Sequence, residues 1–389
     1  MSTRKYGLPT VLHVISSLGV LGGGAQRQLL LYFQHRSPQW RHLVAYQHPK
    51  ALLREEVEAA GVPTVWLGGG GFLPQLVRLL RLVRAEGVNV IHTHLFEANL
   101  LGRAVGRLLR LPVITSLVST LDVQERVASG AYRGPWKYRL SLGLESATGR
   151  WGTWRFIAIS EAVKQTAMRV MALPEGRFQV VYRAVQFPPL DGGRPVRPHP
   201  TLICVGRLVP SKGQDFLIRM LPYVLAQRPT VRLQLVGPGP ERASLENLAE
   251  ELGVAEHVDF LGLREDIFDL LQRADVFVYA SWFEGFTLVI AEATAAGIPV
   301  VSVDLPVTRE TATPESVIFA ARDEETFAAA VLRVLEELPR FNDAARRESE
   351  VVRDRFGVGQ FVHGTEAVYA EAVARRTGAV PVERGAPRW

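Results

Sequence analysis

The sequence predicts an α/β protein made of two doubly wound domains. Short runs rich in β-branched residues alternate with amphipathic helical stretches, which is typical of successive βα units and a parallel sheet covered on both faces. This alternation occurs on both sides of a low-order stretch, QFPPLDGGRPVRPHP, at residues 186–200. With 389 residues, 47% of them hydrophobic, the chain can form two separate cores.

The expected strands follow in chain order. In the first half they are TVLHVIS, HLVAYQ, TVWLG, VIHTHL, VITSLV, FIAIS and FQVVYRAV. In the second half they are TLICVG, VRLQLVG, VDFLG, VFVYAS and VVSV, and the helices between them are QDFLIRMLPYVLAQ, RASLENLAEELG, EDIFDLLQRA and TLVIAEATAAG. Strands of such sheets bind ligands at their carboxyl ends, so we expect the site in a cleft between the domains.

These patterns predict five segments. They are a first domain at 1–185, a linker at 186–200, a second domain at 201–356, a helix at 357–376 that packs back on the first domain, and a disordered tail at 377–389.

Composition excludes some classes of site and favours an anionic partner. The single cysteine, Cys204, rules out an internal disulfide framework, and the nine histidines form no His/Cys cluster at metal-ligand spacing. Basic residues exceed acidic ones by six and the isoelectric point is near 9.6, which suits phosphate, nucleic acid or an acidic membrane surface. Five of the 45 basic residues are lysines, so a lysine at a special position is notable.

We expect a cytoplasmic protein with peripheral contact to a membrane. The first residues resemble a signal peptide, but His13, Ser16 and Ser17 interrupt the apolar run and no A-x-A-like site follows. No segment reaches the roughly 18 apolar residues of a membrane span. Residues 125–156 mix basic side chains with Trp and Tyr, which suits either an anionic bilayer or a packed helix pair. No nucleic-acid-binding motif accompanies them, so we expect no nucleic-acid partner.

Two glycine-containing loops follow predicted strands. Residues 21–30, LGGGAQRQLL, bring Gly23 and Gly24 to the start of a helix, where the backbone can approach an anion or a sugar hydroxyl. A tight turn without a ligand is the alternative for this loop, and its spacing does not fit a dinucleotide fingerprint. In CVGRLVPSKGQDF, Arg207 and Lys212 follow a strand and can converge on one multiply charged anion, although a solvated surface pair is the alternative.

The stretch EGFTLVIAE places two acids eight residues apart. Glu284 is expected in the loop after VFVYAS, and Glu292 within a helix that begins at Thr287 or Leu288. Gly285 permits a close approach, and the N–H groups of Phe286, Thr287 and Leu288 would favour a diphosphate. Glu292 lies among apolar residues and is suited to bonding both hydroxyls of a diol such as ribose.

His92 and His94 alternate along the strand VIHTHL, so both should face one side of the sheet. A metal pair would need a third ligand, which the sequence does not indicate, so we expect no metal site. A packed pair of histidines is as good an interpretation as a functional one.

These motifs together resemble the retaining glycosyltransferase family 4, which has the GT-B architecture of two Rossmann-like domains. The resemblance rests on Glu284-x7-Glu292, on Arg207 with Lys212, on the amino-terminal glycine loop and on FIAISEAV, and it extends over about residues 10–375.

The resemblance implies a role for each of these residues. Arg207 and Lys212 would neutralise the diphosphate, Glu284 would face the donor sugar, and His94 would line the acceptor side. The donor would be held by Gly23, Gly24, Gly262, Leu263, Arg264, Gly285, Phe286, Thr287, Leu288 and Glu292. Such enzymes need no metal or other cofactor, and the sequence contains no D-x-D triplet.

The sequence departs from the family pattern at Val118, where relatives carry His or Arg, and at Arg183-Ala184, where they carry Asn-Gly. The implied function is transfer of a sugar from a nucleotide diphosphate sugar, UDP-linked by expectation, to a polysaccharide or glycolipid acceptor. The alternatives are a binding subunit without turnover, or another GT-B enzyme such as a sugar-nucleotide epimerase.

Overall fold

The computed structural model describes residues 7–19, 24–120, 135–190 and 199–377. The chain divides into two compact units. Unit 1 holds the described parts of 1–121, 136–184 and 358–389, and unit 2 holds those of 122–135 and 185–357. Four predicted features therefore lie outside the described residues in whole or part: Gly23, the segment 125–134, linker residues 191–198 and the tail from 378.

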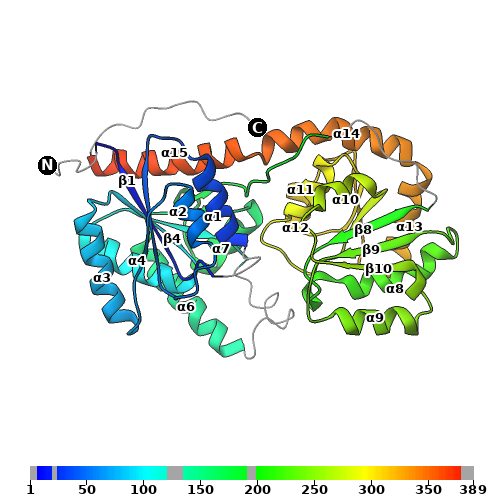
Figure 1. The fold of residues 1–389 in the computed structure, drawn as a ribbon, viewed down its shortest axis with the longest axis horizontal. Helices are drawn as coiled ribbons and strands as arrows, with labels where there is room; N and C mark the ends of the chain where they lie inside the picture. The colour runs from blue at the N-terminus through cyan, green and yellow to red at the C-terminus, as the bar shows by residue number, and fades with distance from the viewer. Residues whose placement is uncertain (1–6, 20–23, 121–134, 191–198, 378–389) are drawn as a thin grey trace. The chain divides into compact units, whose positions relative to one another are not determined.

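Unit 1 is a seven-stranded, all-parallel sheet with the strand order β3-β2-β1-β4-β5-β6-β7 (Figure 1). Its strands are β1 (Thr10–Ile15), β2 (Arg41–Tyr46), β3 (Thr64–Trp66), β4 (Val90–His94), β5 (Val113–Leu117), β6 (Arg155–Ala158) and β7 (Phe178–Val180). Its helices are α1 (Gly24–His35), α2 (Arg54–Ala59), α3 (Phe72–Ala85), α4 (Phe96–Leu109), α6 (Pro135–Gly152), α7 (Glu161–Met171) and α15 (Val358–Thr377).

The apolar sequence of β1 explains why both faces of this sheet are covered. Val11 and Ile15 lie in one cluster with residues of α1 and α15, and Leu12 and Val14 lie in a second with residues of α3 and α4. Because successive side chains of a strand point to opposite faces, a strand with apolar residues on both faces needs a helical layer on each side.

Helix α4 lies close against the sheet because two of its glycines face β4 and β5. A Cβ on Gly102 would lie 2.3 Å from Cγ2 of Thr93, and a Cβ on Gly106 would lie 2.1 Å from Cγ2 of Val113. Any larger residue at either position would push α4 away from the strands that it covers.

A buried ion pair joins α4 to α6. Arg103, 0% exposed, pairs with Glu145 (Nη2 to Oε1, 2.6 Å) and donates from Nε to Thr153 Oγ1 at 2.8 Å. Asn99 donates to the same Glu145 oxygen at 3.1 Å. A buried charge is costly unless it is paired and hydrogen-bonded, so this network fixes how α4 and α6 lie against each other.

Unit 2 is a six-stranded, all-parallel sheet with the order β10-β9-β8-β11-β12-β13. Its strands are β8 (Thr201–Val205), β9 (Arg232–Val236), β10 (Val258–Gly262), β11 (Val276–Tyr279), β12 (Val300–Val303) and β13 (Val317–Ala320). Its helices are α8 (Gln214–Leu225), α9 (Arg242–Glu251), α10 (Ile267–Arg273), α11 (Leu288–Ala295), α12 (Pro306–Thr311), α13 (Glu324–Glu336) and α14 (Leu338–Arg355).

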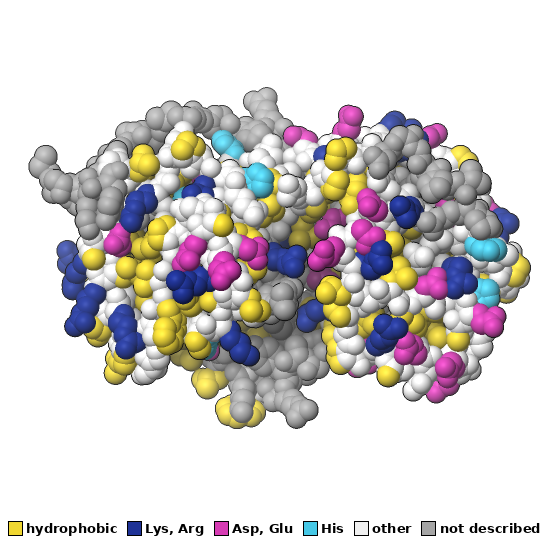
Figure 2. All heavy atoms as spheres, viewed as in Figure 1, with side chains coloured by type: hydrophobic (Ala, Val, Ile, Leu, Met, Phe, Trp, Pro, Cys, Tyr) yellow, Lys and Arg dark blue, Asp and Glu magenta, His cyan; other side chains and the backbone are white. Residues whose placement is uncertain are grey.

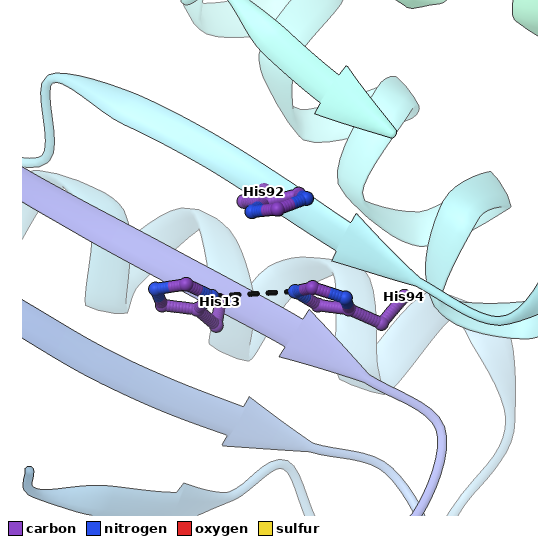
Figure 3. Close-up of side chains that lie close together, drawn as sticks. All are labelled: His13, His92 and His94. Carbon is purple, nitrogen blue, oxygen red and sulfur yellow. Dashed lines mark hydrogen bonds between the residues drawn. The ribbon is translucent and has the colours of Figure 1, made fainter. Parts of the chain in front are cut away.

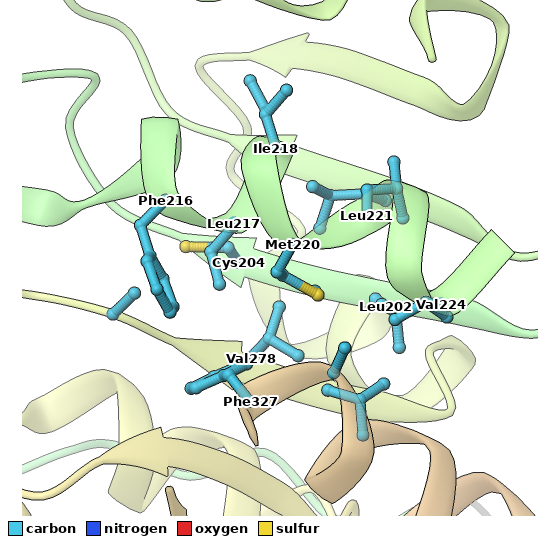
Figure 4. Close-up of a cluster of buried hydrophobic side chains, with 14 of the residues drawn as sticks. Leu202, Cys204, Phe216, Leu217, Ile218, Met220, Leu221, Val224, Val278 and Phe327 are labelled. Carbon is cyan, nitrogen blue, oxygen red and sulfur yellow. The ribbon is translucent and has the colours of Figure 1, made fainter. Parts of the chain in front are cut away.

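The main core of unit 2 lies where α8 and α13 pack against the sheet (Figure 4). Phe216 of α8 and Phe327 of α13 meet edge to face, with ring centroids 5.4 Å apart. Cys204 and Val278 come from the strands and are buried beneath them. Burial raises the pKa of the Cys204 thiol to about 12, so this cysteine is protonated and serves packing.

Both sheets reverse their strand order at one point. In unit 1 the chain turns back between β1 and β4, and in unit 2 between β8 and β11. Ligands of doubly wound sheets bind beside such a reversal, at the carboxyl ends of the strands. His94 ends β4, Arg207 follows β8 and Glu284 follows β11, so these predicted residues lie beside the two reversals.

The predicted α/β class is confirmed, and each strand expected from the sequence forms in the part of the chain that the structure describes. The sequence interpretation missed β13, a short run at Val317–Ala320. On the face drawn in Figure 2, acidic side chains are interspersed among basic ones, so the excess positive charge does not form a single-sign surface there.

Replacing Arg103 with Ala should destabilise unit 1 by about 3 kcal/mol or more, because it leaves Glu145 buried without its partner. Urea unfolding followed by circular dichroism would measure the loss. Arg81→Ala, an exposed arginine on α3, is the control and should change the midpoint little. Equal midpoints for the two variants would show that the buried pair does not stabilise the fold.

Candidate functional site

In unit 2, the loop after β8 presents Arg207 and Lys212 at the carboxyl edge of the sheet. Arg207 is exposed, and Lys212 ends a single 3-10 turn, Pro210–Lys212, just before α8. Gly213 follows with φ 68°, and a Cβ there would lie 2.1 Å from the carbonyl oxygen of Ala280. Only glycine fits this position, so the Lys212 loop is held against the end of β11.

The loop after β11 brings Glu284 to Lys212. The Lys212 ammonium forms an ion pair with Glu284 Oε1. The same oxygen accepts the Tyr279 hydroxyl at 2.7 Å and the Ser281 hydroxyl at 3.1 Å. Two residues 72 positions apart in the sequence therefore share one partly buried site, because β8 and β11 are neighbours in the sheet.

Arg322 supports the loop that carries Glu284, and the sequence interpretation did not identify it. Its guanidinium donates to the carbonyl oxygens of Ala280 and Ser281, both at 2.7 Å. It also lies over the Trp282 ring, 3.9 Å from the centroid. Burial lowers the pKa of Arg322, because removal from water disfavours the charged form of the guanidinium group. No local motif marks Arg322, because its role depends on the fold.

Helix α11 begins at Leu288, as the sequence predicted, with Gly285, Phe286 and Thr287 before it. The Thr287 side chain is 1% exposed and bonds to Thr311 of α12, so any ligand contact there would use its backbone N–H. Glu292 lies on the second turn, and desolvation raises the pKa of its carboxyl group to about 7. A carboxylate beside a helix N-terminus can accept hydroxyl hydrogen bonds next to an anion.

Gly262, Leu263 and Arg264, which the family resemblance places among the residues that would hold the donor, lie at the end of β10. Gly262 has φ 65°, and its carbonyl oxygen accepts the N–H of Gly237 at 2.8 Å. The side chain of Leu263 is 78% exposed, while Arg264 is paired with Asp266 (Nη2 to Oδ2, 2.6 Å). A flat apolar ligand could therefore rest on Leu263, and Arg264 already has a local carboxylate partner.

In unit 1, three buried imidazoles meet at the reversal of the sheet (Figure 3). His13 comes from β1, and His92 and His94 come from β4. The two strands are neighbours in the sheet, with Ile15 of β1 paired to His94 of β4. His13 Nδ1 lies 3.2 Å from His94 Nε2. His92 bonds the hydroxyls of Tyr369 at 2.7 Å and Ser116 at 2.8 Å.

A chain of contacts leads from His94 to a carboxylate on α15. His13 Nε2 lies 3.1 Å from His42 Nδ1, and His42 Nε2 lies 3.3 Å from the Tyr32 hydroxyl. Tyr32 in turn donates to Glu366 Oε1 at 3.4 Å. Burial lowers the pKa of His42 and of His94 to about 3, so these rings are neutral, each with one donor and one acceptor nitrogen.

The expectation that no third metal ligand accompanies His92 and His94 was wrong, because His13 supplies a third imidazole. One nitrogen from each of the three rings lies within 4.8 Å of the others. Ligand nitrogens on a tetrahedral zinc ion lie only about 3.4 Å apart, so the rings would have to move closer to hold one. The hydrogen bonds already made by the three rings favour a packed polar network.

A small cavity of about 50 Å³ adjoins this cluster, lined in part by His92, His94 and Ser116. Val118 and Arg183, the two departures from the family pattern, line the same cavity. The Arg183 guanidinium also lies against the glycine loop, where a Cβ on Gly24 would be 2.8 Å from its Nη1. Val118 and Arg183 therefore both alter the cavity beside His94 in unit 1.

Two neighbours of His94 on α4 have other partners. Glu97 pairs with His48 at 2.6 Å, and Asn99 belongs to the buried Arg103 network.

Helix α6, within the segment predicted to touch a membrane, exposes Trp136, Leu140 and Leu144 on one side, while Tyr138 is buried. No described helix combines the length and hydropathy that a bilayer crossing requires.

Replacing Glu292 with Gln should stabilise the protein more at pH 8 than at pH 5. The folded state raises the pKa of Glu292 from 4.5 to about 7, so it favours the neutral acid. The associated stability is complete below the unfolded pKa and is lost as the pH rises through the folded value, whereas Gln stays neutral. Melting temperatures from pH 5 to pH 9 would show the difference opening. Glu250→Gln, an exposed change on α9, should give no such divergence, and a constant difference for Glu292→Gln would contradict the assignment.

The contact chain should place the proton of His94 on Nε2. An ionised Glu366 can only accept a hydrogen bond, so the Tyr32 hydroxyl donates to it and accepts one from His42 Nε2. His42 Nδ1 then accepts from His13 Nε2, and His13 Nδ1 accepts from His94 Nε2. Nitrogen-15 NMR of labelled histidines reports each tautomer. Glu366→Ala should shift the three rings toward the other tautomer, whereas Tyr369→Phe should not. A stoichiometric zinc ion, or a His94 protonated on Nδ1 in the wild type, would contradict this arrangement.

Comparisons with known proteins place both units in one family. Residues 23–187 match the family model described as Glycosyltransferase Family 4, and residues 199–337 match the model described as Glycosyl transferases group 1. The two matches together span well over half of the chain and include His94 of unit 1 and Lys212, Glu284 and Glu292 of unit 2, whereas His13 lies outside them.

Curated relatives are similar over parts of their length. An uncharacterized glycosyltransferase of Methanocaldococcus jannaschii is 27% identical over 58% of this chain and 60% of its own. A GDP-mannose-dependent monoacylated alpha-(1-6)-phosphatidylinositol monomannoside mannosyltransferase of Corynebacterium glutamicum is 34% identical over 36% of this chain and 38% of its own. The chain therefore spans less than two thirds of the length of these relatives.

Solved structures share the whole fold at low sequence identity. HepE of Anabaena, solved with UDP, has a TM-score of 0.78 at 19% identity, covering 93% of this chain and 100% of its own. Sucrose-phosphate synthase of Thermosynechococcus elongatus has a TM-score of 0.72 at 21% identity, covering 94% and 100%. The predicted GT-B architecture is thus confirmed, and the chain belongs to the group 1 glycosyltransferases of family 4.

Proposed function

We propose that this protein is a retaining, metal-independent glycosyltransferase that uses a nucleotide diphosphate sugar, with UDP-sugars as the first candidates. The observation that carries the proposal is the convergence of Lys212, Glu284 and the N-terminus of α11 at the strand reversal of unit 2. The UDP complex of the Anabaena protein of the same fold supports the choice of nucleotide.

In this proposal, unit 2 binds the donor. Arg207, Lys212 and the first N–H groups of α11 supply the positive charge that a diphosphate needs, and charge-assisted bonds to phosphate are strong. Glu292 accepts the ribose hydroxyls, and Leu263 supports the base. Glu284 is released from Lys212 when phosphate takes the ammonium, and it then faces the donor sugar.

The same groups account for the chemistry. The bond from the anomeric carbon to the diphosphate breaks, and negative charge grows on the departing phosphate oxygens. Lys212 and the helix N-terminus stabilise that charge in the transition state, which is the largest catalytic contribution that this site can offer. A phosphate oxygen of the donor takes the proton of the acceptor hydroxyl, so no metal and no protein base is required.

We propose that unit 1 binds the acceptor, a polysaccharide or lipid-linked glycan, beside His94. The names of the curated relatives that act on phosphatidylinositol glycolipids support a lipid-linked class. The exposed apolar side of α6, with Trp136, Leu140 and Leu144, suits peripheral contact with an anionic membrane on the cytoplasmic side.

A binding subunit without turnover is the second candidate, favoured by Val118 and Arg183 lining the cavity beside His94. A valine cannot donate a hydrogen bond to a sugar there, and Arg183 fills space beside Gly24. Turnover separates this candidate from the enzyme.

A screen of UDP-, GDP- and ADP-sugars by thermal shift and by product analysis tests the proposal. One nucleotide class should raise the melting temperature, and Lys212→Ala should lower turnover by about a hundredfold or more through lost charge stabilisation. Glu292→Ala should weaken nucleotide binding by about tenfold or more, as expected when hydrogen bonds to a charged group are lost. Lys164→Ala, which removes another ion-paired lysine on α7, is the control. Stabilisation without product would favour the binding subunit, and unchanged Lys212→Ala and Glu292→Ala variants would refute the site.

A further inference from the structure

Six of the fourteen residues that line a second pocket in unit 1 are arginines. It has a volume of about 440 Å³ and lies where β5, β6 and β7 begin, at the edge of the sheet opposite to His94. Its six arginines come from α4, α6, the starts of β6 and β7, and α15: Arg107, Arg110, Arg150, Arg155, Arg177 and Arg375. None of these residues takes part in the proposed transfer reaction.

Half of these arginines are held in place by the fold. Arg150 donates from Nε to the carbonyl oxygen of Met171 at 2.7 Å. Arg177 donates from Nε to the carbonyl oxygen of Trp154 at 3.1 Å. Arg155 pairs with Glu371 of α15 at 2.8 Å and stacks on the Trp154 ring, 5.0 Å from its centroid. Guanidinium groups fixed in this way lose little freedom when an anion binds.

The pocket has more positive charge than its own residues neutralise. Within the described residues, Glu371 is the one carboxylate paired with any of the six arginines. The guanidinium groups of Arg107, Arg110 and Arg375 form no hydrogen bond or ion pair with a described residue, and that of Arg375 lies over the Trp154 ring, 6.0 Å from its centroid. Desolvation, and then the charges of Arg155 and Arg375, lower the pKa of Arg177. These like charges repel one another, so a bound anion would reduce the electrostatic repulsion among the arginines.

Solvated surface arginines are the simple alternative in an arginine-rich chain. The carbonyl bonds of Arg150 and Arg177, the partial burial of Arg155 and Arg177 and the concave shape count against it, because independent surface arginines are not fixed by the fold; the other four arginines are exposed. An apolar side chain also lines the pocket, because Trp151 is 57% exposed there. Trp151 continues the exposed apolar side of α6, so a phosphate at an interface with lipid would meet both kinds of group.

We propose that this pocket binds a multiply charged phosphate group, separately from the donor site of unit 2. Arg107, Arg110 and Arg375 would contact the phosphate oxygens. Arg155 and Arg177, which the fold holds in place, would add positive charge around the ligand. A lipid headgroup and a free phosphate compound share this chemistry, because planar guanidinium groups bind phosphate oxygens two at a time.

The test compares Arg107→Gln/Arg110→Gln with a matched control, Arg81→Gln/Arg84→Gln on α3, which removes the same charge from exposed positions of the same unit. Calorimetric titration with inorganic pyrophosphate is done in an Arg207→Ala/Lys212→Ala background, which removes both cationic side chains of the proposed donor site and is shared by the pocket variant and the control. The pocket variant should bind pyrophosphate at least about tenfold more weakly than the control, since each charged hydrogen bond contributes about 1.5–3 kcal/mol.

Sedimentation with vesicles identifies the source of the phosphate. If it is a lipid headgroup, vesicles of phosphatidylcholine with phosphatidic acid should retain the control protein and release the pocket variant, and pure phosphatidylcholine should retain neither. If only pyrophosphate distinguishes the variants, the ligand is a free phosphate compound. Equal behaviour of both variants toward both probes would overturn the proposal. Because no nucleotide sugar is used, this result is independent of whether the donor screen succeeds.

Discussion

The parallel arrangement of both sheets is the constraint on which the rest of this structure depends. Parallel strands all end at one edge, and a reversal of strand order leaves two neighbouring strand ends without a crossing helix between them. Unit 1 reverses between β1 and β4, and unit 2 reverses between β8 and β11. His94 is the last residue of β4, Gly24 begins the helix that follows β1, and the loops that carry Lys212 and Glu284 start at the ends of β8 and β11. Their chemistry is therefore concentrated by topology before any side-chain contact is considered.

Burial then adjusts the groups gathered at those edges. Removal from water raises the pKa of Glu292 to about 7 and lowers that of His94 to about 3, in each case toward the neutral form. Lys212 and Glu284, in contrast, neutralise each other as an ion pair. Unit 2 thus has an ion-paired lysine and a carboxyl group whose pKa is near neutrality.

Unit 1 contrasts two ways of placing polar groups. At its carboxyl edge, neutral histidines and Tyr32 satisfy one another in a closed network that ends at Glu366. At its amino edge, arginines face a pocket with one paired carboxylate, Glu371, among the described residues. The first arrangement pairs neutral groups with one another, whereas the second has unbalanced positive charge, which is why it points to an anionic ligand.

Local sequence determined the fold class, the strands and the start of α11 at Leu288, because periodicity, glycine loops and helix starts are short-range signals. It also identified Lys212 and Glu284 through motifs close to strand ends. The tertiary structure alone decided that these two residues form an ion pair and that His13 joins His92 and His94. It likewise assembled the arginine pocket from five segments. Such contacts depend on strand order and helix packing, which no local window of sequence contains.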